Sequence, residues 1–376
     1  IIMKLGILKE PNYEQRVSLL DEGVLEAIKL KAEVLVEKGA GLSSFVSDEQ
    51  YETAGAKVVS RAEIFEQSDI ILQINAPTDE DLNSLKQGKI IMSMLSPMGN
   101  TTLINALKDM QITSFSMDFI PRSTRAQAMD VLSSMASVAG YKAVLRAAYE
   151  LPHFFPMYIT AAGSIKPSKV LILGAGVAGL QSIATSRRLG AMVEAFDVRS
   201  AAKEEVMSLG AKFVEVAGAT EDKAAGGYAV EQTEEFKQKQ AQVIADHASK
   251  ADVIICTAQI PGRKAPVLIT KETVERMKPG SVIIDLAAST GGNCAYTVNN
   301  SVEIVNGVKI IGESNFPGIA MSIDASKMYG KNTLNFLKLI VGKEGELNLN
   351  FEDDIVKGTC ITHQGEIINE RVKSSL

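Results

Sequence analysis

The stretch VLILGAGVAGLQSIATSRRLGAMVEAFDVR, residues 170–199, decides the fold of this chain. An apolar run leads directly into Gly174, Gly176 and Gly179, and text with helical spacing follows. A second apolar run ends at Asp197, 23 residues after Gly174. A strand, a glycine turn, a helix and a second strand in this order are typical of a parallel α/β sheet.

Each glycine of the turn has a separate physical role. Gly174 permits the tight turn, Gly176 lets the backbone approach a pyrophosphate, and Gly179 lets the helix pack close to the strand. The N-terminus of the helix then offers free N–H groups and a partial positive charge. The turn is therefore a candidate pyrophosphate site, formed by Gly174, Ala175, Gly176, Val177 and Gly179.

The segment Asp197-Val198-Arg199 completes the candidate nucleotide site. An acid about 20 residues after the first glycine binds the ribose hydroxyls of a dinucleotide. Asp197 would repel a 2′-phosphate, so we expect NAD(H) rather than NADP(H). Arg199 is either a neighbour of the adenine or a phosphate partner.

The rest of a dinucleotide should cross the carboxyl ends of the later strands, at the switch point of the sheet. Two loops occupy that place, CTAQIPG (residues 256–262) and DLAASTGGN (residues 285–293). Thr257, Ala258 and Leu286 are their candidate cofactor-binding residues. Neither loop supplies a lysine or histidine for chemistry, and we interpret Asp285 as structural.

Apolar runs alternate with helical text in both halves of the chain, which predicts parallel sheets covered on both faces. The predicted fold is α/β, with two Rossmann-like doubly wound domains and a cleft between them. The first domain comprises residues 1–132 together with 322–376, and the NAD(H)-binding domain comprises residues 133–321. Residues 151–169, with three prolines, are expected to form a linker or cover.

Composition excludes several classes of protein. A net charge of −6 over 376 residues leaves no basic surplus for phosphates, so we expect no nucleic-acid partner. No apolar run approaches the ~18 residues of a membrane span, and we recognise no secretory signal. Cys256, Cys294 and Cys360 lie far apart, which indicates free thiols in a reducing compartment and no metal site.

A second conspicuous stretch is DFIPRSTRAQAMDVLSSMASVAGYKAV, residues 118–144. It places Arg122, Arg125, Gln127 and Asp130 within nine residues, ahead of a helical run rich in Ala and Ser. From the residues alone, this is a solvated helix cap with a salt bridge.

The motifs together resemble one superfamily, which contains alanine dehydrogenase and the NAD(H)-binding component of proton-translocating transhydrogenase. GILKEPNYEQRVSLL, residues 6–20, is similar to the opening that both share, with a KE pair followed by an RV pair. Residues 170–199 are similar to both as well. The resemblance covers nearly the whole chain.

The resemblance to alanine dehydrogenase fails at three positions. Those enzymes carry a lysine and a histidine that hold the substrate, where this chain has Asn75 and Ser96. Their catalytic aspartate is also missing, with Ser289 and Thr290 nearby. An amino-acid dehydrogenase needs a cation for the carboxylate and an acid/base group for the carbonyl. Such a dehydrogenase, of the alanine or lysine-pathway type, remains an alternative, as does a non-catalytic NAD-sensing module.

The stretch around Arg122 resembles a hallmark of the transhydrogenase component. The resemblance implies that Arg122, Gln127, Asp130 and Ser133 surround the nicotinamide and its ribose. Arg122 either holds the loop through Asp130 or reaches the partner nucleotide. AGGYAVEQTEEFKQKQ, residues 225–240, resembles a mobile loop whose tyrosine, here Tyr228, closes over the nucleotide, with Gly226 and Gly227 supplying flexibility.

The resemblance implies a homodimeric, Re/Si-specific, proton-translocating NAD(P) transhydrogenase component. It exchanges hydride between its NAD(H) and the NADP(H) held by a partner domain. A proton-channel membrane domain couples the exchange to proton translocation. The chain is then an intracellular, soluble part peripheral to a membrane complex, and is not secreted.

Overall fold

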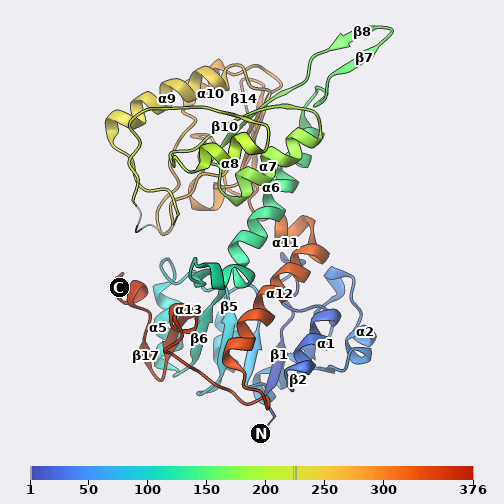
Figure 1. The fold of residues 1–376 in the computed structure, drawn as a ribbon. Helices are drawn as coiled ribbons and strands as arrows, with labels where there is room; N and C mark the ends of the chain where they lie inside the picture. Colours follow the sequence, from blue (N-terminus) through green and yellow to red (C-terminus); the bar gives the residue numbers. More distant parts are fainter. Residues whose placement is uncertain (1, 223, 225–226, 376) are drawn as a thin grey trace. The chain divides into compact units, whose positions relative to one another are not determined.

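A computed structural model describes residues 2–222, 224 and 227–375, and these form two compact units (Figure 1). Unit 1 consists of Ile1–Met135 and Pro317–Leu376, and unit 2 of Ala136–Phe316. Each unit is built on a mainly parallel sheet, which confirms the predicted α/β class.

Unit 1 contains a sheet in the order β17-β16-β6-β5-β4-β1-β2-β3. Its strands are β1 (Lys4–Ile7), β2 (Glu33–Glu37), β3 (Lys57–Val59), β4 (Ile70–Leu72), β5 (Ile90–Ser93), β6 (Thr113–Ser116), β16 (Cys360–His363) and β17 (Glu366–Ile367). Strands β1 to β6 are parallel, whereas β16 pairs antiparallel with β6 and with β17. The strand order reverses between β1 and β4, so the switch point lies there.

Local sequence explains where several unit 1 helices begin. Ser47, Ser60 and Thr78 each form a capping box, at the starts of α2, α3 and α4. The helices are α1 (Asp21–Lys29), α2 (Asp48–Thr53), α3 (Arg61–Gln67), α4 (Asp79–Ser84), α5 (Thr101–Asp109), α12 (Ser322–Ile340), α13 (Asp354–Thr359) and α14 (Glu370–Lys373). The 3₁₀ helices are η1 (Leu42–Ser44), η2 (Met117–Phe119) and η3 (Thr124–Met129), and α11 (Phe316–Ala320) crosses the unit boundary. Phe336 of α12 packs edge-on against Phe115 of β6, with ring centroids 5.1 Å apart.

Unit 2 contains a seven-stranded sheet in the order β11-β10-β9-β12-β13-β15-β14. Its strands are β9 (Lys169–Leu173), β10 (Met192–Phe196), β11 (Lys212–Phe213), β12 (Val253–Cys256), β13 (Val282–Asp285), β14 (Val302–Val305) and β15 (Val308–Ile311). Its helices are α6 (Val131–Glu150), which begins in unit 1, α7 (Val177–Arg188), α8 (Ala202–Ser208), α9 (Glu234–Ala248), α10 (Lys271–Arg276) and η5 (Ala288–Thr290). The strands alternate: Val170 and Ile172 pack with α6, α7 and α8, while Leu171 and Leu173 pack with α9 and α10.

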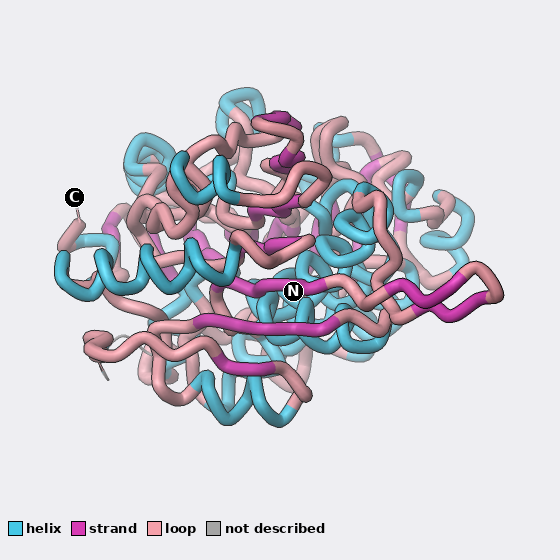
Figure 2. The backbone as a smooth tube through the Cα atoms, turned by 90° about the horizontal axis from the view of Figure 1, so that it is seen from above, coloured by secondary structure: helices cyan, strands magenta, loops and turns pink. Residues whose placement is uncertain are grey.

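Residues 151–169, expected as a linker or cover, contain a hairpin instead. Strands β7 (Tyr158–Thr160) and β8 (Gly163–Ile165) form a separate two-stranded sheet that projects from unit 2 (Figures 1 and 2). All six residues of the two strands are exposed. Ile159 is 74% exposed, so the hairpin presents apolar side chains to solvent.

Candidate functional site

The glycine turn lies at the carboxyl end of β9, at the switch point of the unit 2 sheet, because β10 pairs with one side of β9 and β12 with the other. Gly174 has φ +98°, which favours glycine. A Cβ at Gly174 would lie 2.6 Å from Thr257 Oγ1. The turn therefore takes this path because residue 174 has no side chain.

Gly176 and Gly179 differ in what surrounds them. A Cβ at Gly179 would lie 1.8 Å from the carbonyl oxygen of Gly174, so that glycine allows α7 to pack against the turn. A Cβ at Gly176 would meet no heavy atom within 4 Å. Gly176 is also the N-cap of α7, and no described side chain caps it. The N–H groups that begin α7 at Val177 therefore suit an anionic group.

Asp197 follows β10 and accepts four hydrogen bonds. Its Oδ2 accepts the Ala175 N–H at 2.7 Å and Arg199 Nη2 at 2.8 Å. Its Oδ1 accepts the Arg199 backbone N–H at 2.8 Å and Nε at 2.9 Å. The hydrogen bonds and charge of Asp197 raise the pKa of Arg199. The acid expected to meet ribose hydroxyls is thus paired with the arginine two residues later.

The side chain of Arg199 has a third partner in the loop before α9. Its Nη1 donates to the carbonyl of Gly227 at 2.8 Å. The backbone N–H and hydroxyl of Ser200 both donate to the Glu221 carboxylate. Farther along, Gln232 bonds the backbone of Thr220 in both directions. Arg199 and Ser200, two adjacent residues after β10, therefore both bond to the loop before α9. Gly226, which was expected to give this loop flexibility, lies outside the described residues.

The loops after β12 and β13 are joined through one buried amide. Asn293 accepts the Ala258 N–H at 3.0 Å and donates to the carbonyls of Ala258 and Pro266, each at 2.8 Å. Thr257 donates to the carbonyl of Gly174 at 2.7 Å. Leu286 donates its N–H to the carbonyl of Cys256 at 2.9 Å. These bonds bring Thr257, Ala258 and Leu286 to the same sheet edge as the glycine turn.

Sequence reasoning did not single out Asn293, although it ends the DLAASTGGN loop; an asparagine directly after two glycines was the available signal. Asp285, interpreted as structural, is fully buried. It accepts bonds from Asn293 N, Cys294 N, Ala287 N and Thr297 Oγ1. Burial raises its pKa. The three cysteines are free and buried, as the sequence predicted.

In unit 1, the stretch that contains Gln127 forms η3 and leads into α6. Asp130 precedes α6, and it accepts the Ser133 N–H at 3.0 Å and the Ser133 hydroxyl at 2.6 Å. This bonding is that of a helix N-cap. Arg122 and Gln127 are exposed, and Tyr228 of unit 2 is half-buried. The candidate residues thus form two groups, one in each unit.

Residues from the end of the chain hold η3 in place. Asn332 and Asn335 of α12 donate to the carbonyl of Ala128 at 2.9 Å and 3.1 Å. Arg125 donates to both carboxylate oxygens of Asp353, at 2.7 Å each. The η3 stretch is therefore held within unit 1 by α12 and by Asp353.

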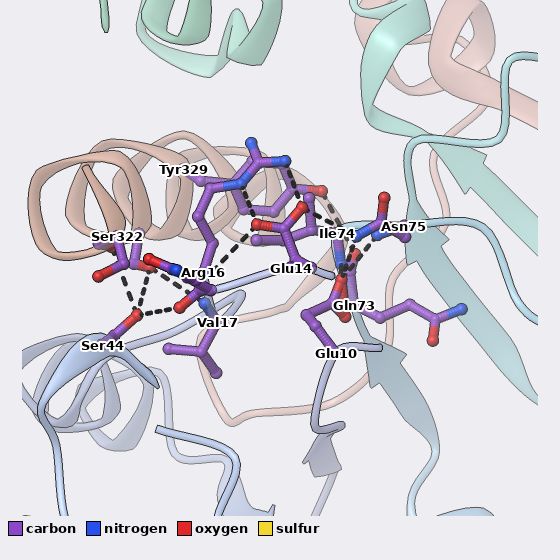
Figure 3. A network of polar contacts seen from close by, with 12 residues as sticks. Glu10, Glu14, Arg16, Val17, Ser44, Gln73, Ile74, Asn75, Ser322 and Tyr329 are labelled. Atoms are coloured by element: carbon purple, nitrogen blue, oxygen red, sulfur yellow. Dashed lines mark hydrogen bonds and ion pairs between the residues drawn. The ribbon is translucent and has the colours of Figure 1, made fainter. Parts of the chain in front are cut away.

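A buried polar network lies where β1 and β4 end, at the switch point of the unit 1 sheet (Figure 3). Glu10 Oε1 accepts the N–H groups of Ile74 and Asn75 at 2.9 Å and 2.8 Å, and Asn75 Nδ2 at 3.1 Å. Glu14 accepts Nε and Nη2 of Arg16, each at 2.8 Å. Glu14 also accepts Asn75 Nδ2 at 3.1 Å, so Asn75 joins both carboxyl groups.

The network contains one ion pair, Glu14–Arg16, and a second carboxyl group, Glu10, whose ionisation is opposed by burial. Burial raises the pKa of Glu10 to about 7. Burial opposes ionisation of Glu14 too, but hydrogen bonds and charge from Arg16 outweigh it, and the pKa of Glu14 is lowered. The charge of Arg16 is neutralised by Glu14. At the other position where alanine dehydrogenases carry a substrate-binding residue, the backbone N–H of Ser96 donates to Asp118 Oδ2 at 3.1 Å. Neither Asn75 nor Ser96 offers a cation or a proton-transfer group here.

Clusters of metal ligands and membrane-spanning helices are both absent from the described part of the chain. It contains no group of three or more His, Cys, Asp or Glu side chains that could hold a metal ion. Within residues 2–222, 224 and 227–375, no helix has the length and apolar character to cross a membrane.

Comparison with known proteins identifies relatives of both units. Residues 6–139 match the family model "Alanine dehydrogenase/PNT, N-terminal domain", and residues 143–370 match "Alanine dehydrogenase/PNT, C-terminal domain". The chain is 45% identical over 378 residues to the first part of the NAD(P) transhydrogenase alpha subunit of Rhodospirillum rubrum, covering 98% of each. It is also 45% identical over 369 residues to NAD(P) transhydrogenase subunit alpha of Haemophilus influenzae, covering 97% of this chain and 72% of that subunit.

A solved structure shows the same relationship. The crystal structure of transhydrogenase from Sinorhizobium meliloti matches with a TM-score of 0.88 at 43% identity, covering 97% of this chain and 100% of that one. These matches confirm the predicted resemblance to the transhydrogenase component. The chain belongs to the alanine dehydrogenase/PNT family.

Proposed function

We propose that this chain binds NAD(H) in unit 2 and exchanges hydride with NADP(H) held by a partner domain. The observation that carries the proposal is the start of α7, where Gly176 has open space above it and no described side-chain cap. A pyrophosphate fits this helix N-terminus. We assign Asp197, which follows the neighbouring strand, to the adenosine ribose, and its negative charge supports NAD(H) over NADP(H).

The residues of unit 1 support direct hydride transfer rather than acid/base chemistry. Transfer between two nicotinamides requires the reacting carbons at near-attack distance, roughly 3–3.5 Å, and no proton donor. We assign Gln127 to the nicotinamide ribose, and Asp130 with Ser133 to the carboxamide. Arg122 orients this group, and Tyr228 closes over the bound nucleotide. Asp130 can serve while it caps α6, because a carboxylate has about four acceptor positions.

The same family membership supports the partners. The relatives are named as alpha subunits, which implies a multi-subunit complex. We propose that a membrane domain of that complex couples Re/Si-specific transfer to proton translocation. The projecting β7–β8 hairpin supports a homodimer, because two-stranded hairpins are marginally stable alone and a second copy would cover its apolar side chains.

The buried network of unit 1 argues against an alanine dehydrogenase activity. A substrate carboxylate would meet Glu10 and Glu14 together with an arginine that Glu14 already neutralises. No observation favours an NAD-sensing module over the proposed exchange.

The test uses the purified chain mixed with the NADP(H)-binding component of a transhydrogenase. We expect NADH binding by equilibrium dialysis, with weaker binding of NADPH, and direct hydride exchange without a membrane. Gln127→Asn should slow exchange at least tenfold while changing NADH affinity less, because the shorter arm misplaces the ribose. Gln67→Asn, at an exposed amide of α3, is the matched control. Absence of exchange in the unmodified mixture, or turnover of pyruvate with ammonium, would refute the proposal.

A further inference from the structure

The Asp197 carboxylate has no acceptor position left for a ligand. An ionised carboxylate offers about four lone-pair positions. Four N–H donors occupy them, two from backbone groups and two from the Arg199 side chain. The backbone donors are fixed by the turn after β9 and the chain after β10. Only the two guanidinium bonds can be exchanged.

We infer that Arg199 is a displaceable counter-ion of Asp197, which the two hydroxyls of the adenosine ribose replace when NAD(H) binds. The inference rests on the proposed function and assigns a step to it. The numbers match, since a vicinal diol has two O–H donors and the guanidinium gives up two N–H donors. Asp197 stays fully bonded before and after, which matters because its side chain is only 6% exposed.

The exchange also reaches the loop before α9. The guanidinium that leaves Asp197 is the group whose Nη1 donates to the Gly227 carbonyl at 2.8 Å. Three of its nitrogens are held in one planar fork by Asp197 and Gly227. A rigid fork cannot leave the carboxylate without altering its bond to Gly227. Ribose binding and release of the Gly227 carbonyl are therefore one event, and Arg199 is a positioning residue for the loop that contains Tyr228.

The direction in which an Arg199 substitution changes NADH affinity distinguishes this role from direct contact with the nucleotide. A displaced arginine costs binding free energy, so Arg199→Met should strengthen NADH binding by about tenfold, equivalent to about 1.4 kcal/mol. An arginine that contacts adenine or phosphate in the complex would instead make Arg199→Met weaken binding. The unpaired Asp197 of the variant should also repel a 2′-phosphate more, so the preference for NADH over NADPH should rise.

The matched control is Arg263→Met. Arg263 pairs with Glu231 of the same loop and makes no contact with Asp197 among the described residues. The Arg263→Met substitution makes the same change of charge and of side-chain length as Arg199→Met. The NADH affinity of this control should stay within about twofold of that of the unmodified protein. Thermal unfolding checks that each variant folds, and Arg199→Gln replaces Arg199→Met if the latter does not.

The second readout is the ¹³C carbonyl resonance of Gly227. In the unmodified protein it should move on saturation with AMP and stay in place with 2′,3′-dideoxy-AMP. In Arg199→Met it should lie near the AMP-bound position before any ligand is added. Weaker NADH binding by Arg199→Met, or a Gly227 resonance that ignores AMP at saturation, overturns the inference. Failure of the unmodified protein to bind NADH and AMP at all would instead refute the proposed function, and this inference with it.

Discussion

Arg125 and Asp353 form a bidentate ion pair with two N···O distances of 2.7 Å, although 228 residues separate them. Asp353 is also the N-cap of α13, where it accepts from Ile355 N and Val356 N. One carboxylate therefore both starts a helix and holds the η3 stretch. Gln127 lies in the same η3 stretch, two residues after Arg125.

Substitution of this pair should separate the two roles. Asp353→Ala removes the cap and the ion pair, and should lower the free energy of unfolding by about 1–2 kcal/mol. Arg125→Met keeps the cap and should cost less than Asp353→Ala, because Arg125 is half exposed and water screens its ion pair. Urea denaturation measures both. Equal losses would show that the cap contributes nothing.

Asp353 also predicts a loss of stability in acid. The Arg125 hydrogen bonds lower its pKa from 3.8 to about 2. A depressed folded-state pKa stabilises the protein above pH 3.8, and that contribution disappears as the pH falls toward 2. Unfolding of Asp353→Asn should depend less on pH across this window than unfolding of the unmodified protein. Identical pH profiles would contradict the assignment.

Glu10 predicts the opposite dependence near neutrality. Its folded-state pKa is raised from 4.5 to about 7, so the folded protein holds a proton that the unfolded chain releases. The contribution of Glu10 to the free energy of unfolding should be greatest below pH 4.5 and should fall as the pH rises to 7, by up to about 3 kcal/mol. All three donors to Glu10 converge on Oε1, so Oε2 can carry the proton without breaking a bond.

Glu10→Gln tests this dependence. Glutamine keeps an acceptor at Oε1 and cannot ionise, so its unfolding free energy should lose the decline between pH 4.5 and 7. Glu66→Gln, at an exposed carboxylate, should keep it. A Glu10→Gln profile parallel to that of the unmodified protein would rule out Glu10 as the titrating group.

The glycines at 176 and 179 should respond to alanine in opposite ways. Gly179→Ala forces a Cβ to 1.8 Å from a backbone oxygen, and should cost at least about 1–3 kcal/mol of stability. Gly176→Ala meets nothing within 4 Å, so its unfolding midpoint should hardly change. Its NADH affinity should fall at least tenfold, because the added methyl group would occupy the path proposed for the pyrophosphate. Unchanged NADH binding by Gly176→Ala would show that this turn does not bind the pyrophosphate.

The homodimer proposed above makes the β7–β8 hairpin a target for mutation. Ile159→Asp places a charge on a strand residue that is 74% exposed, and should raise the dimer dissociation constant at least tenfold without lowering stability. Met207→Asp, on α8 at 56% exposure, should leave association unchanged. Sedimentation equilibrium measures both. Dissociation by Met207→Asp alone would place the contact elsewhere.

The glycine turn could be predicted because its signal is local. Gly174, Gly176, Gly179 and Asp197 lie within 24 residues, and steric demands of the backbone fix each residue type. The α/β class followed from apolar runs alternating with helical text. The pairing of Arg199 with Asp197 was not predicted, because several roles are open to an arginine next to an acid until the backbone places its donors.

Two strand pairings, one local and one long-range, were not predicted, for different reasons. Three prolines in residues 151–169 suggested a linker, and Thr160-Ala161-Ala162-Gly163 lacks the Asn-Gly or Asp-Gly turn that marks a short hairpin. Residues 322–376 were assigned to the first domain, but no strand was predicted among them. Strand β16 forms there because β6 offers an edge, and Ser114 and Thr362 share a 2.7 Å hydrogen bond across it. No short window of sequence contains both β6 and β16, so a local pattern could not reveal their pairing.

The antiparallel pairing of β16 with β6 sets an order of events during synthesis. At roughly 5–20 residues per second, a ribosome needs roughly 10–50 seconds to add the 248 residues between Ser114 and Thr362. All of unit 2, through Phe316, emerges within that interval. The edge of β6 meanwhile presents unpaired N–H and C=O groups, which are a template for pairing with another nascent chain. Unit 2 can fold as soon as it emerges, whereas unit 1 must wait with an open sheet until Cys360–His363 are synthesised.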